Sequence, residues 1–339
     1  MDKEIIVSVV MPIYNEEKYI GKCVESLLLQ DYPLDKTEWI FVDGMSKDKT
    51  REILSGYAEK YGDLIKVYDN PHRIVPYAMN IGIKNSAGKY IVRLDAHADY
   101  DKSYISKCVY YLDNTDADNV GGLAETKSGG FVGETIANML SSKFGVGNSK
   151  FRTNGKSGYV DTVPFGAFRR EVFSKWGGYD ERLVRNQDNE MNYRIRKNGG
   201  KIYLADDIKL TYYCRDSVKG ITDMAFKNGT WNVITGKLCP GAMGLRHFIP
   251  MCFVLSIILL TGLSFVSKYF AFLFAAEGAL YLLCDVFFSI KASRGIRQFF
   301  LSLFLFPAFH ISYGLGSICG IFKLLGKKYR KNGYKPEKI

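Results

Sequence analysis

The feature that most constrains the fold of this chain is the scarcity of charge in its last third. Residues 248–267 carry no charged side chain and are long enough to cross a bilayer as a helix, at about 1.5 Å of rise per residue. Residues 269–290 form a second candidate span, and residues 298–322 form a third that contains Pro307. The last third is therefore expected to be a membrane region.

Two acidic residues interrupt the second of these apolar stretches. Glu277 and Asp285 are eight residues apart, which places them close to one face of a helix. They could line a channel for lipid or acceptor. They could also pair inside the helix bundle or lie near the interface, and we favour this second interpretation.

The charges around the apolar stretches conflict with three full spans. Two spans return the chain to the cytosol at residues 291–297, which carry three basic residues, as the positive-inside rule requires. A third span would place residues 323–339, with seven basic residues against one glutamate, on the other side. We therefore expect a re-entrant or interfacial hairpin bent at Pro307, with a cytosolic tail.

Charge and cysteine usage narrow the class of protein. The formal charge is +11, and the basic tail that follows apolar segments favours contact with anionic membrane lipid over nucleic acid. No nucleic-acid-binding motif occurs, so we expect no nucleic-acid partner. The seven cysteines are scattered without a C-x-x-C pair, which fits reduced thiols better than a disulfide framework.

Short apolar strands alternate with helical patterns in the first part of the chain. The expected strands are residues 5–11, 39–42, 65–68 and 90–94, and the expected helices between them are residues 19–28, 48–61 and 76–84. This alternation predicts an α/β fold, a Rossmann-like, mainly parallel sheet with helices on both faces. Because such connections are right-handed, the strands end along one edge, where Asp43 and Asp95 would share a crevice.

Asp95 ends the fourth expected strand abruptly, and His97 follows in the same turn. A carboxylate at the carboxyl end of a buried strand lies where open α/β sheets bind ligands. The Asp-x-His spacing offers one oxygen and one nitrogen to a single divalent ion. By themselves these residues fit a polar strand end with a capping Asp equally well.

Asp188 is the second carboxylate of interest. Residues 186–190 open a helix that is predicted to run through Arg196, and the helix dipole favours an anion at this position. A carboxyl group that acts as a general base has to be ionised before the reaction, so Asp188 fits that role. The alternative is that Asp188 only caps the helix. The Gly-, Ser- and Asn-rich residues 127–158 contain one helix-like piece, residues 131–144. They are predicted to form a mobile lid or acceptor loop, or else an ordinary surface excursion.

These segments together resemble the inverting, family-2 glycosyltransferases of the GT-A fold. The resemblance covers nearly the whole chain and is nearest to the membrane-associated, succinoglycan glucosyltransferase-like group that builds bacterial exopolysaccharide. It is carried by VSVVMPIYNEEKYIGKCVESLLLQDYP, FVDGMSKDKT, RLDAHADY, residues 160–200 and FKNGTWNVI. The processive synthases' Gln-x-x-Arg-Trp motif is absent, so we expect one sugar to be added per acceptor.

The resemblance implies a role for individual residues. It assigns donor binding to Pro12, Tyr14, Glu16, Asp43, Ser46, Arg73, Asn80 and Asp95. It makes Asp95 and His97 the ligands of Mn²⁺ or Mg²⁺, and Asp188 the general base. It places Gln187, Glu190 and Trp231 on the acceptor side.

The chain departs from the family pattern at two of these positions. Gln187 stands where a glutamate is usual, so tuning of the base by an adjacent carboxylate is lost. His97 stands in place of a second aspartate, and this softer ligand favours Mn²⁺ over Mg²⁺.

The resemblance also implies an organisation along the chain. It predicts a cytosolic GT-A catalytic domain over residues 1–215, an interfacial or acceptor-side segment over 216–247, a membrane region over 248–322 and a basic cytosolic tail over 323–339. The protein would lie in the cell membrane as a multi-pass protein.

The expected reaction is transfer of a hexose from a nucleotide sugar, with a UDP-hexose the first choice, to a lipid-linked saccharide in polysaccharide biosynthesis. One alternative is a nucleotidyltransferase, although residues 12–17 lack the Gly-rich basic loop of that class. The other is a non-catalytic, membrane-anchored component of a polysaccharide assembly.

Overall fold

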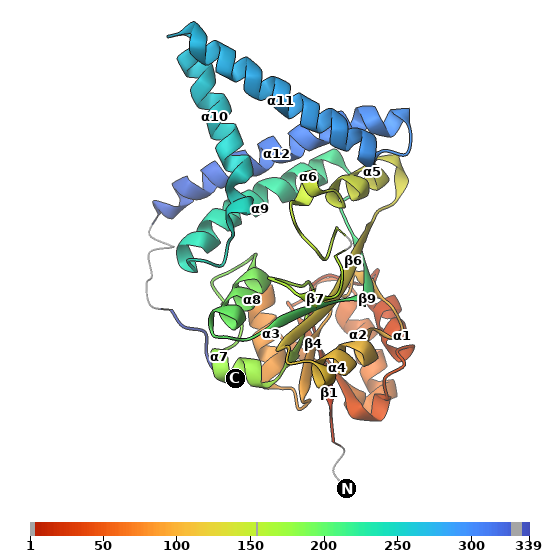
Figure 1. Cartoon of the computed structure of the whole chain (residues 1–339). Helices are drawn as coiled ribbons and strands as arrows, with labels where there is room; N and C mark the ends of the chain where they lie inside the picture. Colours follow the sequence, from red (N-terminus) through yellow and green to blue (C-terminus); the bar gives the residue numbers. More distant parts are fainter. Residues whose placement is uncertain (1–3, 154, 327–333) are drawn as a thin grey trace. The chain divides into compact units, whose positions relative to one another are not determined.

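The computed structural model describes residues 4–153, 155–326 and 334–339, which form two compact units (Figure 1). The first unit takes in the described residues of Met1–Glu125, Asn154–Tyr212 and Gly333–Ile339. The second takes in those of Thr126–Thr153 and Tyr213–Asn332. Residues 327–333 of the predicted basic tail lie outside the described residues.

A single sheet, of nine strands counted over the described residues, forms the centre of the first unit. Its order is β3-β2-β1-β4-β8-β6-β9-β5, with β7 paired to β9. The strands are β1 Val7–Ile13, β2 Thr37–Asp43, β3 Ile65–Asp69, β4 Tyr90–Arg93, β5 Ala98–Tyr100, β6 Asn119–Lys127, β7 Gly158–Tyr159, β8 Ala167–Arg169 and β9 Ile202–Tyr213.

The sheet has a parallel part and an antiparallel part. Strands β3, β2, β1 and β4 are parallel neighbours, whereas β8 pairs antiparallel with both β4 and β6. The chain moves outward from β1 to β3 and then returns to place β4 on the other side of β1. Because crossovers are right-handed, this reversal puts α3 on the face opposite α1 and α2, which confirms the predicted α/β architecture.

Helices of the first unit connect these strands. They are α1 Ile20–Leu28, η1 Leu34–Lys36, α2 Thr50–Tyr61, η2 Gly62–Leu64, α3 Val75–Lys84, α4 Tyr104–Asn114, α7 Glu171–Trp176 and α8 Gln187–Lys197. The helix α3 packs on the three strands β1, β2 and β3. All residues of β2 and β4 are buried, so these two strands form the middle of the core.

The second unit is helical apart from the strand ends that enter it. Its helices are α5 Gly130–Leu140, α6 Lys143–Val146, α9 Val218–Leu238, η3 Leu245–Phe248, α10 Ile249–Ser264, α11 Lys268–Ala292 and α12 Ile296–Leu324. The helices α9 and α12 run side by side (Figure 1) and make the most extensive helix–helix contact in this unit.

The backbones of α9 and α12 approach closely because glycine lies in their interface. A Cβ atom at Gly316 would lie 2.0 Å from the carbonyl oxygen of Phe226, and one at Gly229 would lie 2.0 Å from that of Tyr313. Small residues at such contacts are typical of helices that pack without bulky side chains between them.

Three helices are long and apolar enough to cross a membrane within the described part of the chain, namely Leu245–Ser264, Lys268–Ala292 and Ile296–Leu324. The predicted hairpin at Pro307 is wrong, since α12 continues as one helix through this proline. Loss of the proline's N–H removes one helical hydrogen bond, and contacts of α12 with α9, α10, α11 and α5 compensate for it.

Residues 130–146 form α5 and α6, which confirms the helix expected within residues 127–158. The buried side of α5 includes Ile136, Met139 and Leu140, and α5 packs against α11 and α12. The ring of Phe144 stacks on Phe288 at 5.0 Å. All seven cysteines are described, and none of them forms a disulfide.

Candidate active site

The carboxyl ends of the parallel strands meet at one edge of the sheet. Ile13 at the end of β1 lies opposite Asp43 of β2, which in turn lies opposite Asp69 of β3. Arg93, the last residue of β4, lies opposite Val10 of β1. Since the order in which strands are added to the sheet reverses between β1 and β4, this edge is where an open α/β sheet binds its ligand.

The loops at this edge carry unusual backbone conformations. Asn15, Met45 and Arg73 follow β1, β2 and β3, and their φ angles are 55°, 63° and 59°. A fourth such residue, Asn186 with φ 64°, stands immediately before α8. Non-glycine residues in this region cost about 1 kcal/mol or more each and gather at functional sites.

Asp43 links the first two loops. The backbone N–H and the hydroxyl of Ser46 donate to Asp43 Oδ1 at 3.1 and 2.6 Å, and the Ser46 hydroxyl accepts from Asn15 N at 2.8 Å. Asp43 is buried, and Arg51 Nη1 lies 3.6 Å from its other carboxylate oxygen. The two predicted donor-binding residues Asp43 and Ser46 are thus held together in a fixed geometry.

An exposed aromatic ring lies beside this pair. Tyr14 is 42% exposed, and its ring packs so close to Gly44 that a Cβ there would lie 3.2 Å from Tyr14 Cδ2. Pro12 lies within β1 opposite Val42. A half-exposed ring next to a buried carboxylate can stack on a flat heterocycle whose polar edge meets the carboxylate.

Asp95, His97 and Glu16 form the next cluster along this edge. His97 Nδ1 lies 3.2 Å from Glu16 Oε1, and the Glu16 backbone N–H donates to Thr50 at 2.7 Å. Asp95 Oδ1 lies 3.5 Å from the guanidinium of Arg93.

The chemistry of this cluster fits a divalent ion with few protein ligands. Among the described residues, no three His, Cys, Asp or Glu side chains are arranged to hold a metal. Asp95 and His97 would supply one oxygen and one nitrogen, and the remaining positions would be left to phosphate oxygens and water.

Arg93 is the buried centre of the site. Its side chain is 5% exposed, and its guanidinium donates to Asp188 Oδ1 on α8 and lies 3.5 Å from Asp95. One cation therefore joins the two carboxylates that the sequence singled out. The side chain of Asp188 is 35% exposed, so it keeps contact with solvent.

Electrostatics around Arg93 follow from this arrangement. Burial lowers the pKa of the guanidinium, but the charges of Asp188 and Asp95 outweigh it, so the pKa lies above its ordinary value. Burial and the Asp95 charge raise the pKa of Tyr100 well above its ordinary value. Arg93 thus stays a cation, and Tyr100 a neutral phenol, throughout the working pH range.

Three buried polar atoms near Asp188 have no hydrogen-bond partner among the described residues. They are Arg93 Nε, the Tyr179 hydroxyl and Gln187 Oε1. Burial, followed by the charge of Asp188, raises the pKa of Tyr179, which keeps it a hydrogen-bond donor. Because buried polar groups are normally paired, this cluster is suited to bind a polar molecule beside Asp188.

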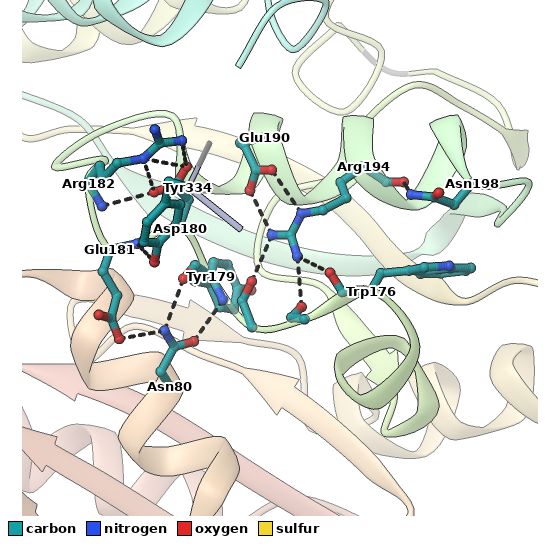
Figure 2. Close-up of polar contacts among 12 residues, drawn as sticks. Asn80, Trp176, Tyr179, Asp180, Glu181, Arg182, Glu190, Arg194, Asn198 and Tyr334 are labelled. Carbon is teal, nitrogen blue, oxygen red and sulfur yellow. Dashed lines mark hydrogen bonds and ion pairs between the residues drawn. The ribbon is translucent and has the colours of Figure 1, made fainter. Parts of the chain in front are cut away.

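Two predicted site residues have structural partners instead. Asn80 on α3 uses its whole amide on Tyr179 N, Tyr179 O and Glu181, at 2.7 to 3.0 Å (Figure 2). Glu190 is buried and forms a two-point ion pair with Arg194 at 2.7 and 2.8 Å. We therefore omit Asn80 from the donor site and Glu190 from the acceptor side.

Two further predicted residues belong to other elements. Arg73 is exposed in the loop after β3. Trp231 lies on α9, in the second unit. The sequence interpretation missed Arg93, although a lone cation in an otherwise apolar strand requires a buried counter-charge and could have indicated its role.

Comparisons with known proteins identify the family of this chain. The family model described as "Glycosyl transferase family 2" matches residues 8–177. The succinoglycan biosynthesis protein ExoA of Rhizobium meliloti is 30% identical over 72% of this chain and 74% of its own. The Methanococcus voltae dolichyl N-acetyl-alpha-D-glucosaminyl phosphate 3-beta-D-2,3-diacetamido-2,3-dideoxy-beta-D-glucuronosyltransferase is 29% identical over 76% of this chain and 82% of its own.

A solved structure shares the fold. The Pyrobaculum calidifontis mannosyltransferase PcManGT, in complex with GDP-Man and Mn²⁺, superimposes with a TM-score of 0.65 at 18% identity. The match covers 95% of this chain and 88% of that one.

An α/β sheet with this edge, followed by long apolar helices, defines an enzyme of the GT-A class of glycosyltransferases, EC 2.4. The chain belongs to glycosyl transferase family 2. This assignment replaces the nucleotidyltransferase alternative.

Proposed function

We propose that the protein transfers a hexose, with inversion, from a UDP-sugar to a lipid-linked saccharide during cell-surface polysaccharide biosynthesis. The names of the Rhizobium and Methanococcus relatives support a glycan product, and the second also supports a lipid-linked acceptor. The long apolar helices would keep the enzyme in the membrane in which such an acceptor is confined. The first unit, which would be the catalytic unit, would face the cytosol, where nucleotide sugars are made.

One observation carries this proposal: the guanidinium of Arg93 joins Asp95, at the end of β4, to Asp188, in the first turn of α8. The two carboxylates are therefore neighbours with separate surroundings. Asp95 is two residues from His97, which contacts Glu16, whereas Asp188 follows Gln187 and its charge acts on Tyr179. This separation suits a leaving group on one side and an attacking hydroxyl on the other.

The donor would occupy the edge formed by the first two loops. Tyr14 would stack on the base, with Asp43 and Ser46 at its polar edge, and Pro12 and Glu16 would line the same loop. Arg73, exposed beyond β3, is retained as a donor-side residue. Asp95 and His97 would hold Mn²⁺ or Mg²⁺, which when bound neutralises charge on the diphosphate.

Asp188 would act as the general base. It would take the proton of the acceptor hydroxyl while that oxygen bonds to the anomeric carbon and the bond to the diphosphate oxygen breaks, its electron pair leaving with the nucleotide. Attack opposite the leaving group inverts the anomeric centre. Gln187, through its unpaired carbonyl, and Tyr179, through its hydroxyl, would orient the acceptor, and Trp231 is retained as a further acceptor-side proposal.

The test uses membranes that contain the full chain, labelled nucleotide sugars, and Mn²⁺ or chelator. We expect one donor to label the solvent-extractable lipid fraction with metal present, and Asp188→Asn to reduce the rate by about 100-fold or more with the protein level unchanged. Asp63→Asn, an exposed carboxylate in η2, is the matched control and should retain full activity. An active Asp188→Asn enzyme would contradict the assignment of the base, and an unchanged cellular phenotype in that variant would favour the non-catalytic alternative.

A further inference from the structure

The last six residues of the chain pack on the catalytic unit. The residues that they contact lie much earlier in the sequence. Tyr334 lies against Arg182, whose guanidinium is 4.3 Å from the ring centroid, and its hydroxyl accepts from Glu181 N at 3.4 Å (Figure 2). The backbone oxygen of Glu337 accepts from Gly178 N at 2.8 Å. Ile339 N donates to the carbonyl of Phe173 at 3.2 Å, which fixes the other end of this peptide.

Two glycines beneath this peptide leave room for it. Gly177 has φ 85°, and a Cβ atom there would lie 2.8 Å from the carbonyl oxygen of Pro336. A Cβ atom at Gly178 would lie 2.6 Å from the side chain of Ile339. Glycine at both positions therefore gives the peptide room that no other residue would leave.

The turn that the peptide contacts, residues 176–178, is bound from the other side by α8. Arg194 of α8 donates to the carbonyls of Trp176, Gly177 and Gly178 at 2.5, 2.8 and 2.7 Å (Figure 2). Glu190, one turn earlier on α8, holds the same guanidinium. Residues 176–178 therefore lie between α8 and the C-terminal peptide.

The residues that follow this turn, 179–182, are also held by hydrogen bonds and an ion pair. Arg182, beneath the Tyr334 ring, pairs at two points with the buried carboxylate of Asp180, at 2.6 to 3.2 Å. Asn80 holds the backbone of Tyr179. The chain then runs from residue 183 to Asn186 and enters α8, so the segment that the peptide contacts leads directly into the start of this helix.

We propose that the C-terminal peptide, residues 334–339, is an intrachain ligand of residues 173–182 that positions the first turn of α8 and with it Asp188. Its effect on turnover rests on the proposed function of Asp188, whereas its docking does not. Because the peptide follows α12 in the chain, the active geometry would require the end of the membrane region to return to the catalytic unit. Correct membrane insertion and catalysis would thus be coupled within one chain.

The experiment compares the full-length protein in membranes with a form that stops after residue 333. Hydrogen–deuterium exchange is measured over residues 173–190 in both, and turnover is measured at saturating donor. A synthetic peptide of sequence YKPEKI is then added at about millimolar concentration, which matches the effective concentration of a tethered segment. Lys335→Ala and Lys338→Ala, at exposed positions of the peptide, are the matched controls.

We expect truncation to increase exchange over residues 173–190, and to lower kcat by about tenfold while the KM for donor stays constant, because small displacements of a catalytic group are costly. The peptide should restore both measurements, and the two lysine variants should behave as the full chain. Unchanged exchange on truncation would overturn the proposal, as would an increase in kcat. If exchange rises and is rescued but no donor supports turnover in any form, the docking stands and the proposed function fails.

Discussion

At the scale of single residues, the buried cation Arg93 decides how the site is held together. An arginine can serve two carboxylates at once because its planar fork carries five donors. Asp95 and Asp188, at 19% and 35% side-chain exposure, keep contact with solvent, whereas Arg93 keeps almost none. Its removal should therefore disturb the placement of the two acids more than the stability of the fold.

We predict that Arg93→Met reduces kcat by about 100-fold through misplacement of Asp188. The free energy of unfolding should fall by about 1–3 kcal/mol, because Asp95 and Asp188 lose their shared partner but keep part of their contact with solvent. Kinetics and thermal unfolding of the detergent-solubilised full chain measure the two effects. The matched control is Arg170→Met, which removes hydrogen bonds to Gly88 O and Ser86 and should leave kcat unchanged. A fully active Arg93→Met enzyme would exclude a positioning role.

At the scale of elements, the contact between α9 and α12 depends on side chains being absent. Gly316→Leu should lower the free energy of unfolding by about 1–3 kcal/mol or more, since its Cβ would meet the backbone of Phe226 at 2.0 Å. Gly278→Leu on α11, where a Cβ would meet nothing within 4 Å, is the matched control. Thermal unfolding of both variants in detergent tests this, and equal midpoints would show that the helices are not in close contact.

The helices and strands differ in how well they could be predicted from the sequence. The strands ending at Asp43 and Arg93 were predictable because their apolar runs are short, buried and closed by polar residues. A helical piece within residues 130–146 was also predictable, but its packing against α11 and α12 was not, because those helices are distant in sequence. Pro307 suggested a bend for a similar reason, since the contacts that support α12 around it are not local.

The residues of the candidate site also differ in how well their roles could be predicted from the sequence. Asp95, His97 and Asp188 are visible from local motifs, and the pairing of Asp43 with Ser46 follows from their spacing within one loop. The roles of Asn80, Glu190 and Tyr334 depend on partners about 100 or more residues away, or on a neighbouring turn whose path the sequence does not specify. Motif matching therefore placed Asn80 and Glu190 beside ligands, whereas Asn80 bonds the backbone of Tyr179 and Glu190 bonds the guanidinium of Arg194.

At the scale of the whole molecule, the C-terminal contacts bear on membrane topology. A peptide that docks on the catalytic unit must lie on the same side of the membrane, so the chain between them crosses an even number of times. The helix α9 carries exposed charges at Lys219, Asp223 and Lys227, which the bilayer core disfavours. Because α12 packs closely along α9, we predict that α10 and α11 are the two crossings.

Thiol labelling from one side of sealed vesicles tests this topology. Single cysteines would be introduced as Lys338→Cys in the C-terminal peptide, Asp63→Cys in the catalytic unit and Val266→Cys between α10 and α11, all at exposed positions. We expect a membrane-impermeant maleimide to label the first two from the same side and the third only from the other side, above the background of the unsubstituted chain. Labelling of Lys338→Cys together with Val266→Cys would mean that α12 also crosses, and the C-terminal peptide could then not reach the active site. The number of crossings therefore decides whether the last residues of this enzyme can take part in its catalysis.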